Sequence, residues 1–205
     1  VQTCALPIFG PKYALVHPQF RISRTRALKS PRESRLQRVL VSFGQGDTAN
    51  AVASALASLV TVHFDGIVTV VLGRGMSQSS FERLAPARTT FCVDVKNMAS
   101  LMAGCNLAIG AGGVSAWERC CLGLPSILVT LAQNQRGVIE TIVDAGAGID
   151  AGADGPGLEQ RVTRILRQLL GGEHSMQTMS EAGVALIDGR GRSEEHTSEL
   201  QSRGL

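Results

Sequence analysis

From residue 38 onward, short runs of apolar residues alternate with longer segments in which apolar residues recur with helical spacing. The short runs are typical of buried strands, and the longer segments are typical of helices that bury one face. Strands that alternate with helices in this way predict an α/β fold, in which a parallel sheet carries helices on both faces. We predict strands at residues 38–44, 66–72, 90–93, 107–110, 126–129 and 148–150, and helices at 49–60, 78–84, 98–103, 115–122, 135–145, 158–170 and 176–187.

Two of these segments carry more specific expectations. The strand Gly66–Leu72 is apolar or β-branched along its length, which is typical of a strand covered on both faces. The helix that begins at Ser115 has Glu118 three residues on, so the pair fits a capping box with Ser115 as the N-cap. Because such sheets bind ligands at the carboxyl ends of their strands, near a switch in strand order, the loops after the strands are where we expect a site.

The two ends of the chain differ from the rest. The segments Val1–Ile8 and Arg192–Ser202 can be encoded by DNA strands that are reverse complements of each other, and both match translated sequencing-adapter DNA. We therefore expect residues 1–8 and 192–205 to be adapter-derived, and the native part to belong to a longer protein. The alternative is that the segment beginning at Ser193 is a native helix turn with a serine cap.

Composition and charge narrow the class of protein. The chain has 205 residues, of which 44% are hydrophobic and 18% charged, which fits one globular domain with one core. Much of the net charge of +3 lies in residues 21–38, which contain seven arginine or lysine side chains and no aromatic residue. We interpret this stretch as a solvated connecting segment rather than a nucleic-acid-binding patch.

Several other classes are excluded by what the sequence lacks. Its longest apolar runs are far shorter than the roughly 20 residues of a membrane helix. The five cysteines and four histidines show no metal-ligand spacing, so we expect no metal and no cofactor. Unpaired, buried thiols favour a reduced, cytoplasmic protein.

The loop after the first predicted strand contains Gly44, Gln45 and Gly46. Glycines allow the backbone to approach a ligand closely, and the start of the following helix favours an anion. This loop is therefore a candidate for binding phosphate, although a tight turn without a ligand is an equal alternative. It is not a P-loop, because no Gly-Lys-Ser/Thr sequence follows.

The loop after the fourth predicted strand gives a stronger signal. Gly110, Gly112 and Gly113 lie between a strand and a helix, and Ser115 and Glu118 follow. A carboxylate at this place can accept hydrogen bonds from the two hydroxyls of a ribose. That role competes with the capping box, because the same side chain serves both only if it turns outward.

Two further loops hold candidates with ordinary structural alternatives. Asn134 and Gln135 are amide side chains at a helix start, suited to sugar hydroxyls or a phosphate oxygen, and the alternative for Asn134 is helix capping. Backbone groups near Val95 can bind the edge of a base while Met98 packs beneath, and the alternative is a plain loop in which Asn97 caps the helix.

Taken together, the segments GPKYALVHPQF, LVSFGQGD, NMASLMAGCNLAIGAGG, SAWERCCLGLPSILV and NQ resemble the UDP-2,4-diacetamido-2,4,6-trideoxy-β-L-altropyranose hydrolases of pseudaminic acid biosynthesis. The resemblance covers Gly10 to Gly191, and a more distant one exists to the C-terminal domain of the peptidoglycan GlcNAc transferases. Both are GT-B enzymes, in which two Rossmann-like domains bind the ligand in the cleft between them. The resemblance implies that residues 38–191 form the C-terminal, UDP-binding half of a GT-B fold and that residues 9–37 are an inter-domain segment.

The resemblance also implies roles for individual residues. The first loop would lie near the diphosphate, Val95 would present its backbone to uracil with Met98 behind it, and Glu118 would bind the ribose. The second glycine loop with Ser115 would line the pyrophosphate pocket, and the two amides would face the sugar or phosphate. The implied substrate-binding residues are Gly44, Gln45, Gly46, Val95, Met98, Gly112, Gly113, Ser115, Glu118, Asn134 and Gln135.

The implied reaction is hydrolysis of a UDP-linked sugar, with attack of water at the anomeric carbon and release of UDP. The alternative is a GT-B glycosyltransferase similar to the UDP-GlcNAc transferases. The hydrolases carry their general-base histidine in the N-terminal domain, and no residue of this chain matches it, so the partner needed for catalysis is the missing N-terminal domain. The first loop also departs from the hydrolases, which usually have two adjacent glycines where this chain has Gly44-Gln45-Gly46.

Overall fold

The computed structural model describes residue 14 and residues 16–29 and 36–189. Both predicted adapter segments lie outside these residues. Six strands are present, β1 Arg38–Ser42, β2 Ile67–Leu72, β3 Thr89–Val93, β4 Leu107–Ala111, β5 Ser126–Thr130 and β6 Gly148–Ala153. The α-helices are α1 Pro18–Lys29, α2 Ala49–Thr61, α3 Met98–Ala103, α4 Val114–Cys121, α5 Arg136–Asp144, α6 Leu158–Leu170 and α7 Met176–Leu186, and short 3₁₀ helices span Gln78–Ser80 (η2), Glu82–Leu84 (η3) and Gln133–Gln135 (η4).

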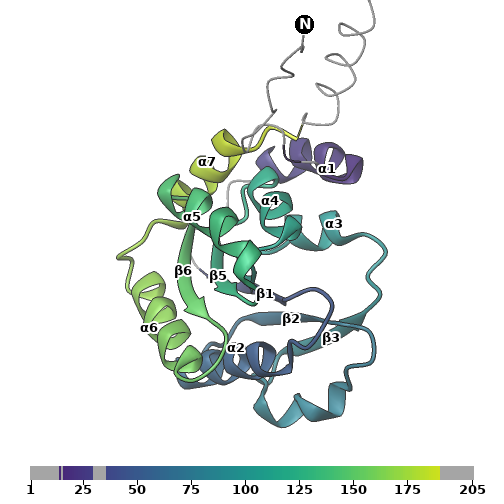
Figure 1. The fold of residues 1–205 in the computed structure, drawn as a ribbon, viewed down its shortest axis with the longest axis vertical. Coiled ribbons are helices and arrows are strands. Elements are labelled where there is room, and N and C mark those ends of the chain that lie inside the picture. The colour runs from purple at the N-terminus through teal and green to yellow at the C-terminus, as the bar shows by residue number, and fades with distance from the viewer. Residues whose placement is uncertain (1–13, 15, 30–35, 190–205) are drawn as a thin grey trace, which may run out of the picture.

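All six strands join one parallel sheet in the order β3-β2-β1-β4-β5-β6 (Figure 1). The chain builds outward from β1 to β3, returns to the centre, and then builds outward in the other direction from β4. The strand order therefore switches between β1 and β4, which are hydrogen-bonded neighbours. This is the strand order of the doubly wound Rossmann fold, so the switch point is where a ligand is expected.

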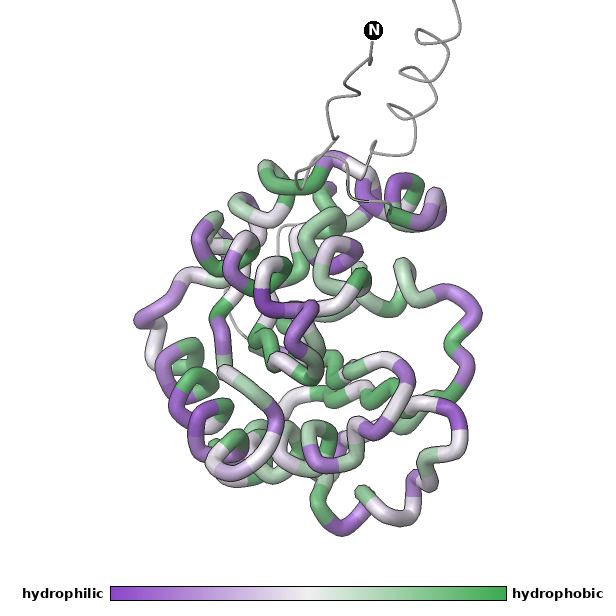
Figure 2. The backbone as a smooth tube through the Cα atoms, in the orientation of Figure 1, coloured by the Kyte–Doolittle hydropathy of each residue, from purple (hydrophilic) through white to green (hydrophobic). Residues whose placement is uncertain are grey.

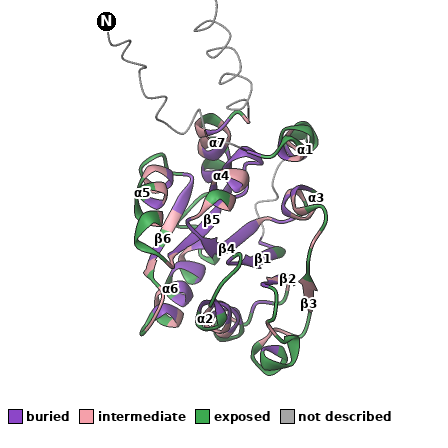
Figure 3. Ribbon diagram, turned by 45° about the vertical axis from the view of Figure 1, so that its right-hand side comes forward, coloured by how far each residue is buried: buried purple, intermediate pink, exposed green. Residues whose placement is uncertain are grey.

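Helices cover both faces of the sheet, as predicted. Figures 1 and 3 show α2 and α6 on one face, and α1, α3, α4, α5 and α7 on the other. Alternate residues of each strand enter the two cores. In β1, for example, Val39 and Val41 face the core beneath α2 and α6, while Leu40 faces the core beneath α4. Figure 2 shows the apolar residues concentrated in the strands and along the sheet-facing sides of the helices.

Most predicted elements agree with the structure to within a few residues, but β2 departs from its expected environment. The pattern predicts a strand covered on both faces, whereas its residues alternate between buried and half-buried. Val68, Val70 and Leu72 are buried beneath α2, while Ile67, Thr69 and Val71 on the other face are only partly covered. The expectation was wrong for this second face, because β2 and β3 lie toward the end of the sheet farthest from α4, α5 and α7 (Figure 3).

The first part of the basic segment forms a packed helix, while Arg21, Arg26 and Lys29 on it are exposed to solvent as predicted. Residues 18–29 form α1, and Phe20 and Ala27 are buried in the core that also contains α3 and α4 residues. Arg24 donates hydrogen bonds to the carbonyl oxygens of Cys121 at 2.6 Å, Ile187 at 2.7 Å and Val184 at 2.8 Å. These carbonyls lie at the carboxyl ends of α4 and α7, where a cation is favoured by the helix dipole. The helix α1 is thus packed onto the sheet domain.

The described residues contain free thiols and lack a membrane-spanning helix and a cluster of metal ligands. Among the described residues, no helix is long and apolar enough to cross a membrane, and no group of three or more His, Cys, Asp or Glu side chains could hold a metal ion. Four cysteines of this part are free thiols, and burial raises the pKa of Cys120 to about 12. That thiol stays protonated and packs as a small apolar side chain.

Candidate functional site

The predicted site residues lie in the loops that leave the carboxyl ends of β1, β3, β4 and β5, or in the first turns of the helices that follow those loops. Because the sheet is entirely parallel, these ends meet at one edge. The loops after β1 and β4 flank the switch point directly. The fold therefore places the two glycine loops side by side, with the loops after β3 and β5 on either side of them.

The loop after β1 has the backbone of a glycine turn. Gly44 and Gly46 have φ angles of 81° and 106°, which side-chain-bearing residues rarely adopt. Both glycines and Gln45 between them are exposed. The helix α2 follows from Thr48, whose side chain makes no cap hydrogen bond. The loop therefore presents open backbone near a helix start, as a phosphate-binding loop requires.

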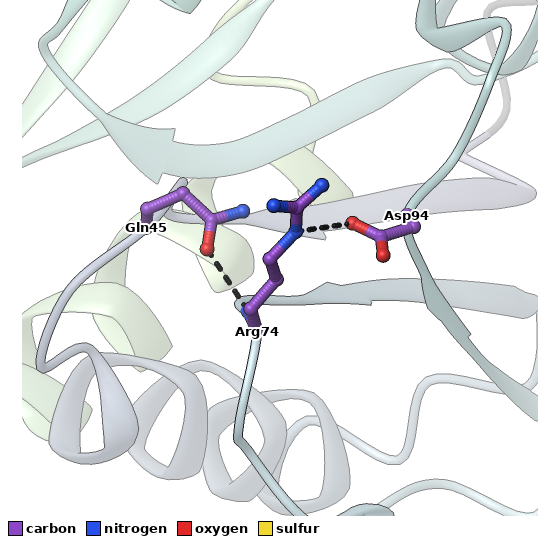
Figure 4. Close-up of polar contacts among 3 residues, drawn as sticks. All are labelled: Gln45, Arg74 and Asp94. Atoms are coloured by element: carbon purple, nitrogen blue, oxygen red, sulfur yellow. Dashed lines mark hydrogen bonds and ion pairs between the residues drawn. The ribbon is translucent and has the colours of Figure 1, made fainter.

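Gln45 is held in place by the loop after β2, as Figure 4 shows. Its Oε1 accepts a hydrogen bond from the backbone amide of Arg74 at 2.9 Å. The Arg74 Nε in turn donates to Asp94 Oδ1 at 2.9 Å, and the two side chains are 78% and 59% exposed. The loops after β1, β2 and β3 are thereby linked at the rim. Sequence reasoning missed Arg74 and Asp94, because the pairing depends on β2 and β3 being neighbours in the sheet.

The second glycine loop is tightly packed against α5. A Cβ on Gly112 would lie 2.2 Å from Ile139 Cγ1, so only glycine fits there without movement. A Cβ on Gly113 would lie 3.9 Å from Gln135 Nε2. The loop after β5 therefore approaches the loop after β4 closely, and Gln135 is its nearest side chain to Gly113. Gln135 Oε1 also accepts a hydrogen bond from the amide of Leu131 at 3.1 Å, which fixes the amide group.

The helix α4 begins earlier than the sequence pattern indicates. Its N-cap is Gly113, not Ser115, and no side chain caps the helix. The capping box of Ser115 and Glu118 is therefore wrong, because Ser115 lies inside the first turn. An uncapped helix start leaves its first amides without helical acceptors. The amides of Gly113, Val114 and Ser115 are consequently available to an anion.

Glu118 does not cap α4 and lies one turn into that helix. Its side chain is half-buried, and burial raises the pKa of the carboxyl group, while a hydrogen bond with Ser115 and the charges of Arg119 and His17 oppose that shift. The Ser115 hydroxyl thus donates to the Glu118 carboxylate within the helix. The capping role considered for Glu118 is therefore wrong, and its role toward a ligand stays a prediction.

Asn134 and Gln135 differ in their surroundings. Asn134 is exposed in η4 and makes no cap hydrogen bond, so the capping alternative for it is wrong. Gln135 is half-buried and is the N-cap residue of α5, although its side chain does not cap that helix. Gln135 therefore faces the glycine loop, whereas Asn134 is exposed to solvent.

The loop after β3 leads into α3 on the same face of the sheet as α4 (Figures 1 and 3). Asn97 caps α3, since its Oδ1 accepts from the amide of Ser100 at 2.9 Å. The structural role considered for Asn97 is therefore confirmed. Met98 is half-buried and packs against the core beneath α4, and Val95 is half-buried beside the exposed Asp94.

The two glycine loops and the start of α4 form an exposed surface at the carboxyl edge of the sheet, which we call the shelf. Gly44 to Asp47 are exposed, and Val114 at the start of α4 is 65% exposed although it is apolar. Near the shelf, a cavity of about 260 Å³ lies between the ends of β5 and β6, lined by Thr130, Arg136, Ile139, Glu140, Asp150, Gly152 and Ala153. This edge offers backbone amides to an anion, with the Glu118 carboxyl group one turn into α4.

The chain is similar in sequence to a distant relative and similar in fold to solved structures. No family model matches the chain. It is 23% identical over 188 residues to the spore coat polysaccharide biosynthesis protein SpsG of Bacillus subtilis, and the match covers 89% of this chain and 54% of SpsG. The chain thus spans about half the length of this curated relative.

Two solved structures illustrate the likeness in fold. MurG of Acinetobacter baumannii superposes with a TM-score of 0.57 at 18% identity, covering 88% of this chain and 53% of MurG. The glycosyltransferase VinC, in complex with dTDP, superposes with a TM-score of 0.56 at 16% identity, covering 87% of this chain and 44% of VinC. The predicted fold class is therefore confirmed as a Rossmann-like parallel sheet of the GT-B kind.

Proposed function

We propose that this chain is the nucleotide-binding half of a GT-B enzyme that acts on a UDP-linked sugar. The observation that carries the proposal is the meeting of two glycine loops, the uncapped start of α4 and Glu118 at one edge of the sheet, beside the switch in strand order. The amides at the start of α4 suit the diphosphate, the loop of Gly44 to Gly46 suits its other side, and Glu118 suits the ribose hydroxyls. Val95 and Met98 are assigned to the base, and Asn134 and Gln135 to the sugar or phosphate.

The chemistry of such a site is to bind and stabilise the leaving group. When the bond between the anomeric carbon and the diphosphate breaks, negative charge grows on the departing phosphate oxygen. Amides at a helix start are fixed dipoles that favour this charge without reorganising. This half of the enzyme therefore promotes departure of UDP, while the group that attacks the anomeric carbon comes from outside the shelf.

Two reactions are compatible with a site that binds the departing UDP while another part of the enzyme supplies the attacking group. Transfer of the sugar to an acceptor is the one the comparisons favour, because VinC, which is similar to this chain in fold, is a glycosyltransferase that binds dTDP. Hydrolysis by water in pseudaminic acid biosynthesis is the second candidate and is supported by the resemblance of the loops. In a protein that joins this chain to an N-terminal domain, a hydrolase releases UDP from a UDP-sugar in buffer alone, whereas a transferase requires an acceptor.

Titration calorimetry with UDP tests the binding role on the chain itself. We expect weak binding of UDP and no release of UDP from UDP-GlcNAc, since no attacking group is assigned to this half. Glu118→Ala should weaken UDP binding by about 1.5–3 kcal/mol, the range for a hydrogen bond to a charged group.

The matched control for this test is Glu181→Ala, which removes an exposed carboxylate on α7. It should leave the affinity for UDP unchanged. Equal affinities of the unmodified chain and the Glu118→Ala variant would show that Glu118 does not bind the nucleotide. Release of UDP from UDP-GlcNAc by the chain alone would contradict the claim that the attacking group comes from another part of the enzyme.

A further inference from the structure

Arg119 is a buried cation that the candidate site does not yet explain. It lies in α4 directly after Glu118 and is only 1% exposed, which makes it one of the largest fully buried side chains among the described residues. Burial lowers its pKa to about 10, partly opposed by the negative charge of Glu118. The guanidinium therefore remains charged at neutral pH, inside the protein.

The guanidinium group of Arg119 lies at the end of β4. Its Nη2 donates to the carbonyl oxygen of Ala111 at 2.6 Å. Its Nη1 lies 2.8 Å from the position that a Cβ on Gly110 would occupy, and the same Cβ would lie 2.2 Å from the carbonyl oxygen of Ser42. The guanidinium thus occupies space that Gly110 leaves free, beside the ends of β1 and β4 at the switch point.

The charge of Arg119 is incompletely compensated. Within the described part of the chain, Nε is buried and has no hydrogen-bond partner, and no hydrogen bond joins the guanidinium to a carboxylate. Burying a charge without a hydrogen-bonded counter-ion is costly, and an anion bound nearby would compensate this charge. The uncapped start of α4, which favours an anion, belongs to the same loop that Arg119 supports.

We propose that Arg119 is a positioning residue for the diphosphate of the nucleotide. By holding the Ala111 carbonyl it fixes the turn from β4 into α4, so that the amides of Gly113, Val114 and Ser115 face the anion. Its positive charge lies at the end of β4, where that turn begins, and adds to the attraction of the diphosphate. This inference rests on the proposed function, since it concerns the same site.

Comparison of UDP with uridine distinguishes interactions with the diphosphate from interactions with the base and the ribose. A residue that acts on the phosphates should affect UDP but not uridine, which carries the same base and ribose. Arg119→Met should therefore lower the ratio of UDP to uridine affinity about tenfold, the effect of one charge interaction in a partly screened site. Arg119→Lys, which retains the charge, should keep part of that ratio, whereas Arg119→Gln should lose it as Arg119→Met does.

Arg24→Met is the matched control, because Arg24 also binds carbonyl oxygens, including that of Cys121 at the opposite end of α4. It should lower stability and leave the ratio of UDP to uridine affinity unchanged. An unchanged ratio in Arg119→Met, or an equal loss in Arg24→Met, would overturn the role of Arg119 in binding the diphosphate. Failure of the unmodified chain to bind UDP would overturn the proposed function as well.

A second measurement needs no substitution and applies even if Arg119→Met does not fold. The Nε–H group of Arg119 is buried and unpartnered, so its NMR signal should be observable and sensitive to nearby charge. Titration with UDP should shift that signal, and titration with uridine should not. Shifts of equal size with both ligands, or with neither, would contradict the proposal.

Discussion

Glu118 is ionised less readily than an exposed glutamate, because its side chain is half-buried and burial raises its pKa. A carboxylate makes stronger hydrogen bonds to ribose hydroxyls where water is partly excluded. The same partial burial disfavours the ionised form of the Glu118 carboxyl group when no ligand is bound. The role proposed for Glu118 therefore carries a cost in stability for the free protein.

Glu118→Gln tests that cost through the pH dependence of unfolding. A carboxyl group whose pKa is raised on folding favours the folded state at low pH, and the folded state loses that advantage as the pH rises through the folded-state pKa. The Gln variant should therefore unfold at a higher temperature than the unmodified chain near about pH 7, and the difference should vanish below about pH 4, where Glu118 is protonated in both states. Thermal unfolding followed by circular dichroism measures this difference.

The control for this comparison is Glu140→Gln, which alters an exposed glutamate on α5. It should show no such dependence on pH. A Glu118→Gln variant that is less stable than the unmodified chain at neutral pH would mean that attraction to Arg119 and His17 outweighs burial.

Individual residues also show what sequence reasoning could and could not supply. The glycines of both loops were identifiable, because glycine between a strand and a helix is a local signal. The start of α4 was not, since Ser115 and Glu118 match a capping box so well that Gly113 was passed over as the N-cap. Arg119 was missed because burial is a tertiary property, although an arginine between Ala116 and Cys120, both buried, was a signal that could have been used.

At the scale of elements, α1 shows how composition can conceal a pattern. The many arginines of this segment indicated a solvated connection. Phe20, Arg24 and Ala27 nevertheless recur at helical spacing and so lie on one face of a helix. That face packs against the core, and Arg24 binds three carbonyl oxygens from α4 and the end of α7.

The docking of α1 predicts a measurable contribution from Arg24. Arg24→Ala should lower the free energy of unfolding by about 1–3 kcal/mol, because it leaves the carbonyl oxygens of Cys121, Val184 and Ile187 without this donor. Denaturant unfolding of the chain measures the change. Arg26→Ala, an exposed arginine on the same helix, should change it by no more than about 0.5 kcal/mol. Equal effects of the two substitutions would show that α1 is not docked through Arg24.

At the scale of the whole molecule, the alternation of strands and helices was sufficient to predict the fold. Periodicity identifies strands and helices, and right-handed crossovers between parallel strands leave few ways to arrange them. The strand order itself came from the structure, and with it the position of the switch between β1 and β4. Contacts across that order, such as Gln45 with Arg74 and Arg74 with Asp94, therefore could not be predicted from the sequence.

The central claim is that a nucleoside diphosphate binds at the carboxyl edge of the sheet, beside that switch. Titration of the ¹⁵N-labelled chain with UDP, followed through its backbone amide signals, tests it most directly. We expect shifts concentrated at residues 44–47, at 113–115 and at Gln135. Shifts confined to the opposite edge of the sheet, around residues 63–66, or an absence of shifts at saturating UDP, would contradict it.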